Sequence, residues 1–487
     1  MELKKISLKI FSVIVLCYNI FYGSIYAQNK HATGLLFDSI SYNKIETISR
    51  ALKFNEQNQS YYSLKQYCPS PGNQNPLGTC TGWATGYAAM TIAYSIQNNI
   101  TDKELITKNA KSAMYLFKKQ ILLENPNCEK GAYIENILET GKLFGDCDFE
   151  DFNTVDCNVP PKSNLDEKAK QCKIQEYYTL FNSLSFNNTN QKLSAIINCI
   201  SSKKPIIVSL NLYESFDGLK IDGIYSPKTS EKKTGRHAVC IVGYDNVSKQ
   251  FELINSWGEN WGNKGFFKMS YVDFIRDCNG AYQFSLVKNI NTNTILKGSF
   301  QLLNFTKIDN NTGWPEFSIA PTNSIKKGVY TLFRDVKKDE FFRLKAKNLT
   351  ADSYVYVLTL KPNRKAEILF PLNYSKNNTN EPVDIPLVTS SLMTIELPYD
   401  LNNGYTTDQK GEDYMCILFS KNRISNLDTL IKKLENANDI EAWLDNSFGS
   451  DLISAEYIDY VNGEMSFSTK PNNKGNIVPI ILKVNVN

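Results

Sequence analysis

The pattern of apolar positions changes along the chain, from mixed helix and strand signals to a mainly β pattern. A glycine-containing loop at 74–79 leads into a segment with large side chains at helical spacing, namely Trp83, Tyr87, Met90 and Tyr94. This spacing predicts a helix that begins near Cys80. Two later segments, 235–245 and 251–258, begin as apolar runs separated by a polar turn around 246–249. They predict two strands joined as a hairpin.

After residue 300, short β-rich runs alternate with turn clusters rich in Asn, Asp and Gly. The clearest runs are 353–360, 367–370, 392–397 and 414–419. One helix is predicted among them, because apolar residues recur at helical spacing from Leu427 to Leu434. A domain boundary near 290–312 follows from this change of pattern.

Composition limits the classes of function. The 487 residues allow about three domains or two larger ones. A net charge of +4 gives no indication of a nucleic-acid partner. Two histidines, and 11 cysteines with no C-x-x-C spacing, argue against a histidine-rich metal site or a zinc ribbon. We therefore expect no metal and no other cofactor.

The N-terminus has the parts of an export signal. Three lysines precede an apolar run from Ile10 to Leu16, and Ala27 offers a small residue for cleavage before Gln28. An uncleaved membrane anchor is the alternative, but the run is short and Asn19 interrupts it. We expect a cleaved signal peptide and an exported protein, in the periplasm, at the cell surface or in the medium, with no stable membrane span. Export permits disulfides, whose pairing the sequence leaves open.

Cys80 is the candidate nucleophile. Its predicted place at a helix N-terminus would stabilise a thiolate through the exposed N–H groups there. A buried structural cysteine or half of a disulfide is the alternative for this residue alone. The decision therefore depends on a base and an orienting group elsewhere in the chain.

Three polar residues complete the candidate site. His31 lies just past the expected cleavage point, so elimination selects His237 as the base. If the hairpin turns around 246–249, Asn255 lies opposite Val239 and one diagonal step from His237. Its amide oxygen could then hold the imidazole, and the Gln74 amide could donate to a developing oxyanion beside the Cys80 N–H.

These segments resemble the papain-like cysteine peptidases. The matching motifs are Gln74, Gly78-Thr79-Cys80, His237-Ala238-Val239, Val242-Gly243-Tyr244, Asn255-Ser256-Trp257-Gly258 and Trp261-Gly262. The resemblance covers about residues 60–290. It implies a two-lobed α+β fold, with a helical lobe that begins at the Cys80 helix and a β-rich lobe that carries His237 and Asn255. It also implies that Trp257 shields the hydrogen bond between His237 and Asn255.

Two departures set this sequence apart from the plant and lysosomal members of that family. Thr81-Gly82 stand between the nucleophile and Trp83, and the position three residues before the nucleophile is Leu77 rather than cysteine. Both features resemble bacterial branches of the family. Residues 28–67 show no helix pattern typical of an inhibitory propeptide, so the sequence does not support autoinhibition by this segment.

The predicted organisation has five parts, and the last resembles an uncharacterised bacterial accessory domain. They are a signal peptide (1–27), an N-terminal segment (28–64), a papain-like domain (65–293), a linker (294–311) and a mainly β, sandwich-like domain (312–487). The C-terminal half has no histidine, and its one cysteine, Cys416, lies in an apolar strand and is expected in the core. We interpret this half as a binding or positioning module.

The leading hypothesis is a secreted cysteine endopeptidase that acts on proteins or peptides through a thioester acyl-enzyme. One alternative is a non-catalytic exported protein that binds peptides or mediates adhesion. Another is an acyl-transfer enzyme, a ligase or transpeptidase, on the same fold. The sequence does not separate hydrolysis from aminolysis, and it leaves the oligomeric state open.

Overall fold

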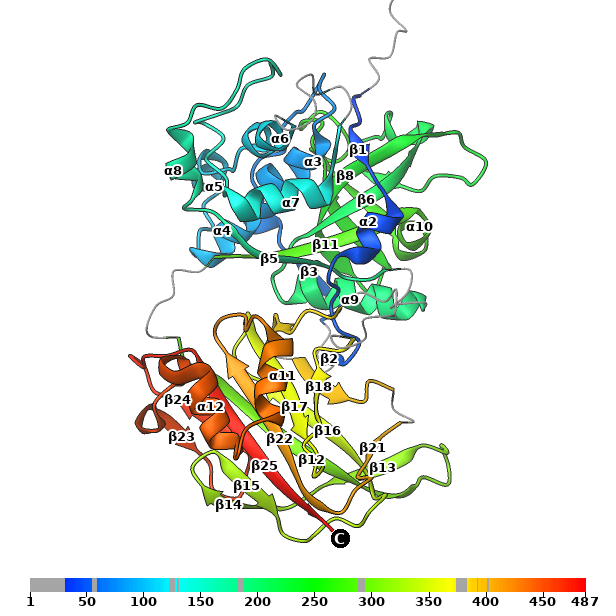
Figure 1. The fold of residues 1–487 in the computed structure, drawn as a ribbon. Coiled ribbons are helices and arrows are strands. Elements are labelled where there is room, and N and C mark those ends of the chain that lie inside the picture. The colour runs from blue at the N-terminus through cyan, green and yellow to red at the C-terminus, as the bar shows by residue number, and fades with distance from the viewer. Residues whose placement is uncertain are drawn as a thin grey trace, which may run out of the picture.

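The computed structural model describes residues 31–54, 59–121, 128, 131–182, 188–287, 294–373, 383–391, 393–400 and 403–487. The predicted signal peptide lies outside these residues. Helices and strands are both abundant in the described chain, and three large sheets dominate it (Figure 1). The α+β class is therefore confirmed. No helix in the described ranges is long and apolar enough to cross a membrane.

A helical lobe begins at the candidate nucleophile. Its helices are α3 (Cys80–Gly82), the π-helical η2 (Trp83–Met90), α4 (Thr91–Gln97), α5 (Lys103–Lys108), α6 (Ala113–Ile121), α7 (Ile134–Leu143) and α8 (Leu165–Ala169). The first three follow one another without a break, as the helical spacing predicts. Trp83, Tyr87 and Met90 are buried, because this continuous helix packs against α6, α7 and the neighbouring β-rich lobe.

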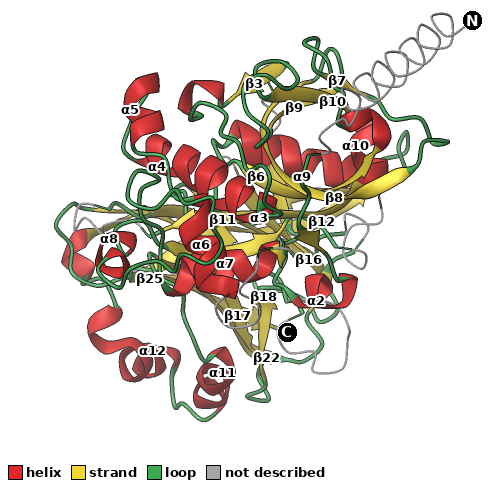
Figure 2. Ribbon diagram, turned by 90° about the horizontal axis from the view of Figure 1, so that it is seen from above, coloured by secondary structure: helices red, strands yellow, loops and turns green. Residues whose placement is uncertain are grey.

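The β-rich lobe is built on an eight-stranded, strongly curved sheet. In spatial order its strands are β5 (Ile174–Thr179), β11 (Cys278–Leu286), β6 (Ile206–Tyr213), β8 (Lys233–Asp245), β9 (Gln250–Ile254), β10 (Phe266–Ser270) and β7 (Ile224–Tyr225), with β3 (Tyr61–Ser63) beside β8. Helices α9 (Thr189–Ser201) and α10 (Tyr271–Asp277) pack against these strands (Figure 2). The helical and β-rich lobes together give the predicted two-lobed arrangement.

The C-terminal part is a sandwich of two sheets. The first contains β2 (Leu52–Phe54), β20 (Met393–Leu397), β16 (Phe341–Asn348), β12 (Lys297–Ile308), β24 (Ser466–Thr469), β23 (Ile458–Tyr460), β13 (Pro315–Ile319) and β21 (Tyr405–Thr406). The second contains β14 (Thr322–Lys326), β15 (Val329–Leu332), β25 (Ile477–Val486), β22 (Gly411–Ser420), β17 (Ser353–Leu360), β18 (Ala366–Phe370) and β19 (Leu387–Val388). Cys416 is buried in β22, as predicted.

Two helices and one aromatic contact complete the sandwich. Helices α11 (Leu427–Glu435) and α12 (Ile440–Phe448) pack against each other, and α11 contacts β18. Between the sheets, the rings of Phe419 and Phe467 lie 5.0 Å apart. A Cβ at Gly298 would meet the Phe419 ring at 2.5 Å, so glycine lets β12 approach the opposite sheet.

The structure differs from the predicted linker at 294–311. Residues 297–308 form β12, a strand hydrogen-bonded to both β16 and β24 within the first sheet. Its alternate residues Phe300 and Leu302 are buried, so this segment is part of the sandwich core and not an exposed connection. The remaining domain boundaries stay predictions.

The N-terminal segment ties the two parts together. We call residues 31–54 the strap. Its strand β1 (Leu35–Leu36) pairs in parallel with β4 (Ala132–Tyr133), α2 (Ser39–Lys44) follows, and β2 joins the first sheet of the sandwich beside β20 (Figure 1). Between α2 and β2, the Arg423 guanidinium donates to the carboxylate of Glu46 and, at 3.4 Å, to that of Glu176 in β5.

One disulfide is formed, between Cys128 and Cys157, whose Cα atoms are 5.9 Å apart. The other eight cysteines among the described residues, Cys80 included, are free thiols. The candidate nucleophile is therefore not half of a disulfide.

The inter-sheet aromatic contact allows a test of the sandwich. Replacing the buried ring in Phe419→Ala should lower the free energy of unfolding of the C-terminal part by about 3–5 kcal/mol, because it leaves a cavity between two sheets. Urea unfolding, monitored by tryptophan fluorescence, measures this free energy of unfolding. The control Phe333→Ala removes a ring that is 64% exposed and should change stability by less than about 0.5 kcal/mol. Equal effects of the two changes would contradict this packing.

Candidate active site

The candidate nucleophile lies where the two lobes meet. Cys80 is the first residue of α3 and is fully buried. Backbone N–H groups of Ala238, in β8, and of Gly34, in the strap, lie close enough to its sulfur to favour the charged form. Ala238 follows His237 directly, so the fold brings the thiol and the predicted base to the same place.

The hairpin register brings the base and its predicted orienting residue together. A bulge between Ile241 and Gly243 sets Cys240 opposite Ile254. Continuing this register by one residue places Asn255 opposite Val239, as the sequence predicts. The side chains then meet, with His237 Nε2 2.7 Å from Asn255 Oδ1.

A second donor fixes the protonation of the imidazole. The backbone N–H of Ser256 also donates to Asn255 Oδ1, at 2.8 Å, which requires an oxygen at that position. His237 Nε2 must therefore carry the hydrogen of the 2.7 Å bond. In the neutral ring Nδ1 is then a free acceptor, and it is buried with no hydrogen-bond partner. His237 is thus held in the tautomer that a general base requires.

The amide of Gln74 is fixed in the same manner. Its Oε1 accepts from the Ser256 hydroxyl at 2.6 Å. Its Nε2 donates to two carbonyl oxygens, those of Leu77 and Ala32, each at 3.0 Å. Carbonyl oxygens only accept, so the amide nitrogen must face them. One N–H of the predicted oxyanion donor is therefore engaged by the strap.

Trp257 covers the imidazole. Its ring centroid lies 5.0 Å from that of His237, and only 4% of the residue is exposed. Phe216 packs edge-on against both rings. This apolar cover keeps water from the hydrogen bond between His237 and Asn255, which is the role that the family resemblance implies.

The strap crosses the site along its whole width. A Cβ at Gly34 would lie 1.7 Å from the carbonyl oxygen of Gly78, so only glycine fits this closely beside the nucleophile loop. The Gly34 carbonyl accepts from the N–H of Ala132 at 3.0 Å. At the other end, the His31 ring stacks on Trp257. The strap therefore lies against the nucleophile loop at Gly78 and against Trp257.

Burial keeps both reacting groups uncharged. It raises the pKa of the Cys80 thiol to about 11, although several backbone N–H groups oppose the shift. Burial also lowers the pKa of His237 to about 4, against the effect of the Asn255 hydrogen bond and with a smaller contribution from His31. At neutral pH the site therefore holds a thiol and a neutral imidazole rather than an ion pair.

Sequence reasoning missed the strap. His31 was set aside because it lies near the expected cleavage point, yet the structure places it at the site, against Trp257 and Asp217. No periodic pattern marks residues 31–37, since their contacts are mostly backbone contacts with distant segments. The one feature of the sequence that could have pointed to His31 is that the chain has only two histidines.

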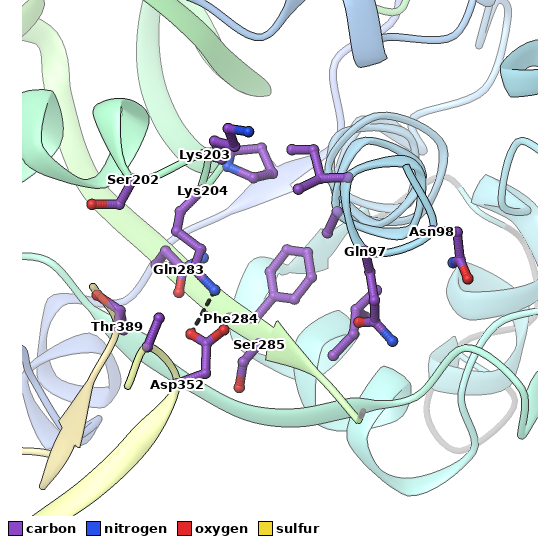
Figure 3. A pocket seen from close by; sticks show the side chains of 15 residues that line it. Gln97, Asn98, Ser202, Lys203, Lys204, Gln283, Phe284, Ser285, Asp352 and Thr389 are labelled. Atoms are coloured by element: carbon purple, nitrogen blue, oxygen red, sulfur yellow. Dashed lines mark hydrogen bonds and ion pairs between the residues drawn. The ribbon is translucent and has the colours of Figure 1, made fainter. Parts of the chain in front are cut away.

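No cluster of three or more His, Cys, Asp or Glu side chains suited to a metal ion occurs in the described ranges. A cavity of about 530 Å³ lies elsewhere, where the β-rich lobe meets the sandwich. Figure 3 shows Lys204 paired with Asp352 across it, at 2.6 Å, with Gln283 and Ser285 nearby. None of the candidate catalytic residues lines this cavity, so it is not the active site.

Comparisons with known proteins find papain-like relatives for this part of the chain. The profile described as papain family cysteine protease matches residues 124–287, which include His237 and Asn255 but not Cys80. An uncharacterised peptidase C1-like protein of Acanthamoeba polyphaga mimivirus is 29% identical over 224 residues, 45% of this chain and 69% of that protein. Cathepsin K of Mus musculus is 25% identical over 210 residues, 42% of this chain and 57% of that protein.

Among solved structures, xylellain, a cysteine protease from Xylella fastidiosa, aligns with a TM-score of 0.43 and 18% identity, over 53% of this chain and 97% of that one. These sequence matches support a cysteine peptidase, which is a hydrolase. Residues 124–287 match the papain family cysteine protease domain.

The buried thiol can be tested by alkylation. Below the Cys80 pKa of about 11, the thiolate fraction falls tenfold per pH unit, so iodoacetamide should modify Cys80 slowly at pH 7. In Gly34→Val the side chain cannot fit against Gly78, so the strap should leave the cleft and the rate at pH 7 should rise by roughly tenfold or more. Mass spectrometry of the Cys80 peptide measures both rates.

The matched control is Ile40→Val, at an exposed position of the strap in α2. This change shortens the side chain by one methylene group and adds no bulk. It should leave the alkylation rate unchanged. A Gly34→Val protein that reacts no faster than the unaltered chain would contradict the view that the strap covers Cys80.

Proposed function

We propose that this protein is a secreted cysteine endopeptidase that is latent while the strap lies in its cleft. Cys80 is the nucleophile, His237 the general base and then acid, and Asn255 the residue that orients the imidazole. Gln74 and the backbone N–H of Cys80 stabilise the oxyanion, and Trp257 shields the hydrogen bond between His237 and Asn255. The substrate is a protein or peptide.

The first half of the reaction forms the acyl-enzyme. The Cys80 thiol passes its proton to His237 Nδ1 while the sulfur attacks a peptide carbonyl carbon. The resulting oxyanion accepts from the Gln74 amide and the Cys80 N–H. The C–N bond then breaks, Nδ1–H protonates the leaving amine, and a thioester remains on Cys80.

The second half releases the product. Nδ1 takes a proton from a water molecule, whose oxygen attacks the thioester carbonyl. The thiolate leaves, takes back the proton from Nδ1, and the peptide departs with a carboxylate. Because Nε2–H stays bonded to Asn255 Oδ1, Nδ1 serves as the base in both halves of the reaction.

One observation carries this proposal. Asn255 Oδ1 accepts from both His237 Nε2 and the Ser256 N–H, which leaves the buried His237 Nδ1 without a hydrogen-bond partner. A purely structural histidine would be expected to have both ring nitrogens satisfied, since an unpartnered buried nitrogen costs about 1–3 kcal/mol. A free acceptor nitrogen is what a general base needs and stability does not, and the next residue, Ala238, has its backbone N–H near the Cys80 sulfur.

The latent state is supported by the contacts of the strap. Ala32 occupies an N–H of Gln74, and Gly34 fills the space between Gly78 and Ala132. The sandwich holds the other end of the strap, through β2 and the Arg423 side chain. The C-terminal part therefore serves as the anchor of the inhibitory segment. Export of the mature chain is proposed on the sequence of residues 1–27 alone.

The experiment that tests the activity compares full-length chains on denatured casein under reducing conditions. Gly34→Val should cleave casein faster than the unaltered chain, because the cleft is open. Adding Cys80→Ala to Gly34→Val should abolish cleavage. Cleavage that survives Cys80→Ala would refute the thiol mechanism. Absence of cleavage in Gly34→Val, with Cys80 readily alkylated, would favour a peptide-binding protein or another substrate.

The oxyanion role gives a second test. Gln74→Ala in the Gly34→Val background should lower kcat by roughly 10²–10³, the usual loss for one oxyanion donor, with KM little changed. Steady-state assays on a fluorogenic peptide measure this split. The control Gln97→Ala changes the same side chain far from Cys80 and should leave kcat unchanged. If KM changed and kcat did not, Gln74 would not be an oxyanion donor.

Hydrolysis and aminolysis differ only in the acceptor of the acyl group. Adding an amino-acid amide to the same digest distinguishes them, since a transpeptidase would give ligated products in place of free carboxylates. The covered, apolar surroundings of the His237 ring do not by themselves select either acceptor. Hydrolysis is proposed here because the relatives with a described activity are named as proteases or cathepsins.

A further inference from the structure

The His31 side chain lines a hollow near the candidate catalytic groups. The hollow has a volume of about 390 Å³, and its other walls come from the segment 212–217, from Thr234 and from Trp257. His31 and Thr33 of the strap also line it. If the strap leaves, as the proposed function requires, this hollow becomes free for a side chain of the substrate.

The contacts of His31 define what the hollow recognises. His31 Nδ1 lies 2.7 Å from Asp217 Oδ1, and the His31 backbone N–H donates to the same oxygen at 3.0 Å. The imidazole lies almost parallel to the Trp257 indole, with ring centroids 4.3 Å apart and an interplanar angle of 8°. A carboxylate at the edge of a flat aromatic platform suits a planar group that carries N–H donors and positive charge.

Two acidic residues line this hollow. They are Glu214 and Asp217, and the side chain of Asp217 is only 21% exposed with the strap in place. The one ion-pair partner found for Asp217 among the described residues is His31. Loss of the strap therefore leaves a partly buried carboxylate that gains from a new cationic partner.

The hollow is close to the bond that would be cleaved. Trp257 contacts the His237 ring on one side and the His31 ring on the other. Ala32, the next strap residue, is held by the oxyanion donor Gln74, and Gly34 lies at the thiol. A substrate side chain in this hollow is thus within a few residues of the scissile carbonyl.

We infer that Asp217 is a specificity-determining residue and that the enzyme selects substrates with a planar cationic side chain, arginine or protonated histidine, in the hollow between Asp217 and Trp257. This inference rests on the proposed function. It also assigns the strap a second property, since His31 occupies the subsite as a substrate side chain would. Lysine fits less well, because its ammonium pairs with Asp217 without stacking on the indole.

Cleavage profiling tests the inference in the full-length Gly34→Val protein. A peptide library digested and analysed by mass spectrometry should show enrichment of arginine or histidine at one position near the cleaved bond. Asp217→Asn should lower the ratio of kcat/KM for an arginine peptide over its leucine counterpart by roughly ten- to a hundredfold, the range for a hydrogen bond to a charged group. A flat profile, or a ratio unchanged by Asp217→Asn, would overturn the inference.

The charge-matched control is Asp222→Asn. Asp222 is an exposed residue a few positions along the same loop and outside the hollow, so the ratio should stay as in Gly34→Val. An equal drop in both variants would mean that the net charge of the protein, and not the subsite, sets the preference.

A binding measurement separates this inference from the proposed function. An acetylated peptide of residues 31–37, and the same peptide with leucine in place of His31, are titrated into full-length Gly34→Val/Cys80→Ala protein, which cannot turn over. The peptide with His31 should bind roughly tenfold more tightly, because its imidazole pairs with Asp217 and stacks on Trp257. Equal affinities, or no binding by either peptide, would overturn the subsite. Selective binding without any proteolysis by Gly34→Val would leave the subsite standing and refute the proposed function.

Discussion

The amide oxygen of Asn255 is the acceptor on which the catalytic arrangement depends. It receives hydrogens from His237 Nε2 and from the Ser256 N–H, so a neutral imidazole carries its proton on Nε2 and leaves Nδ1 free. The Ser256 hydroxyl also donates to Gln74 Oε1, so the Gln74 amide nitrogen faces the carbonyl oxygens of Leu77 and Ala32. One short polar segment at the end of β9 therefore orients both the imidazole of His237 and the amide of Gln74.

The strap lies beside groups whose pKa values are shifted. Burial is the main cause of the high pKa of Cys80 and the low pKa of His237. A thiolate–imidazolium pair needs a polar or solvated surrounding to be the stable form. In the proposed latent state, the strap covers Cys80 and is part of the surroundings that keep both groups uncharged.

The sandwich contributes to the site through the strap. The strand β2 is hydrogen-bonded to β20, and Arg423 bonds to Glu46 in the strap and Glu176 in the β-rich lobe. The strap is anchored in a sheet of the sandwich and also lies in the cleft between the two lobes. It therefore couples the two parts of the chain. In this arrangement, release of the strap requires loss of sheet pairing or a cut in the chain, so many contacts would hold the proposed latent state.

The sequence by itself indicated four strands of the sandwich, near 353–360, 367–370, 392–397 and 414–419, and the candidate site of Cys80 with three polar residues. These follow from local information: helical spacing after Cys80, apolar runs with turn residues, and a hairpin that brings Asn255 beside His237. The two-lobed α+β fold followed from the resemblance of the motifs to the papain-like peptidases. Only the tertiary structure decided the rest. The paths of β2, β12 and the strap depend on pairing with strands distant in sequence. The His31 subsite, and the pKa values of Cys80 and His237, depend on which segments cover the cleft, and periodicity along a chain carries no information about that.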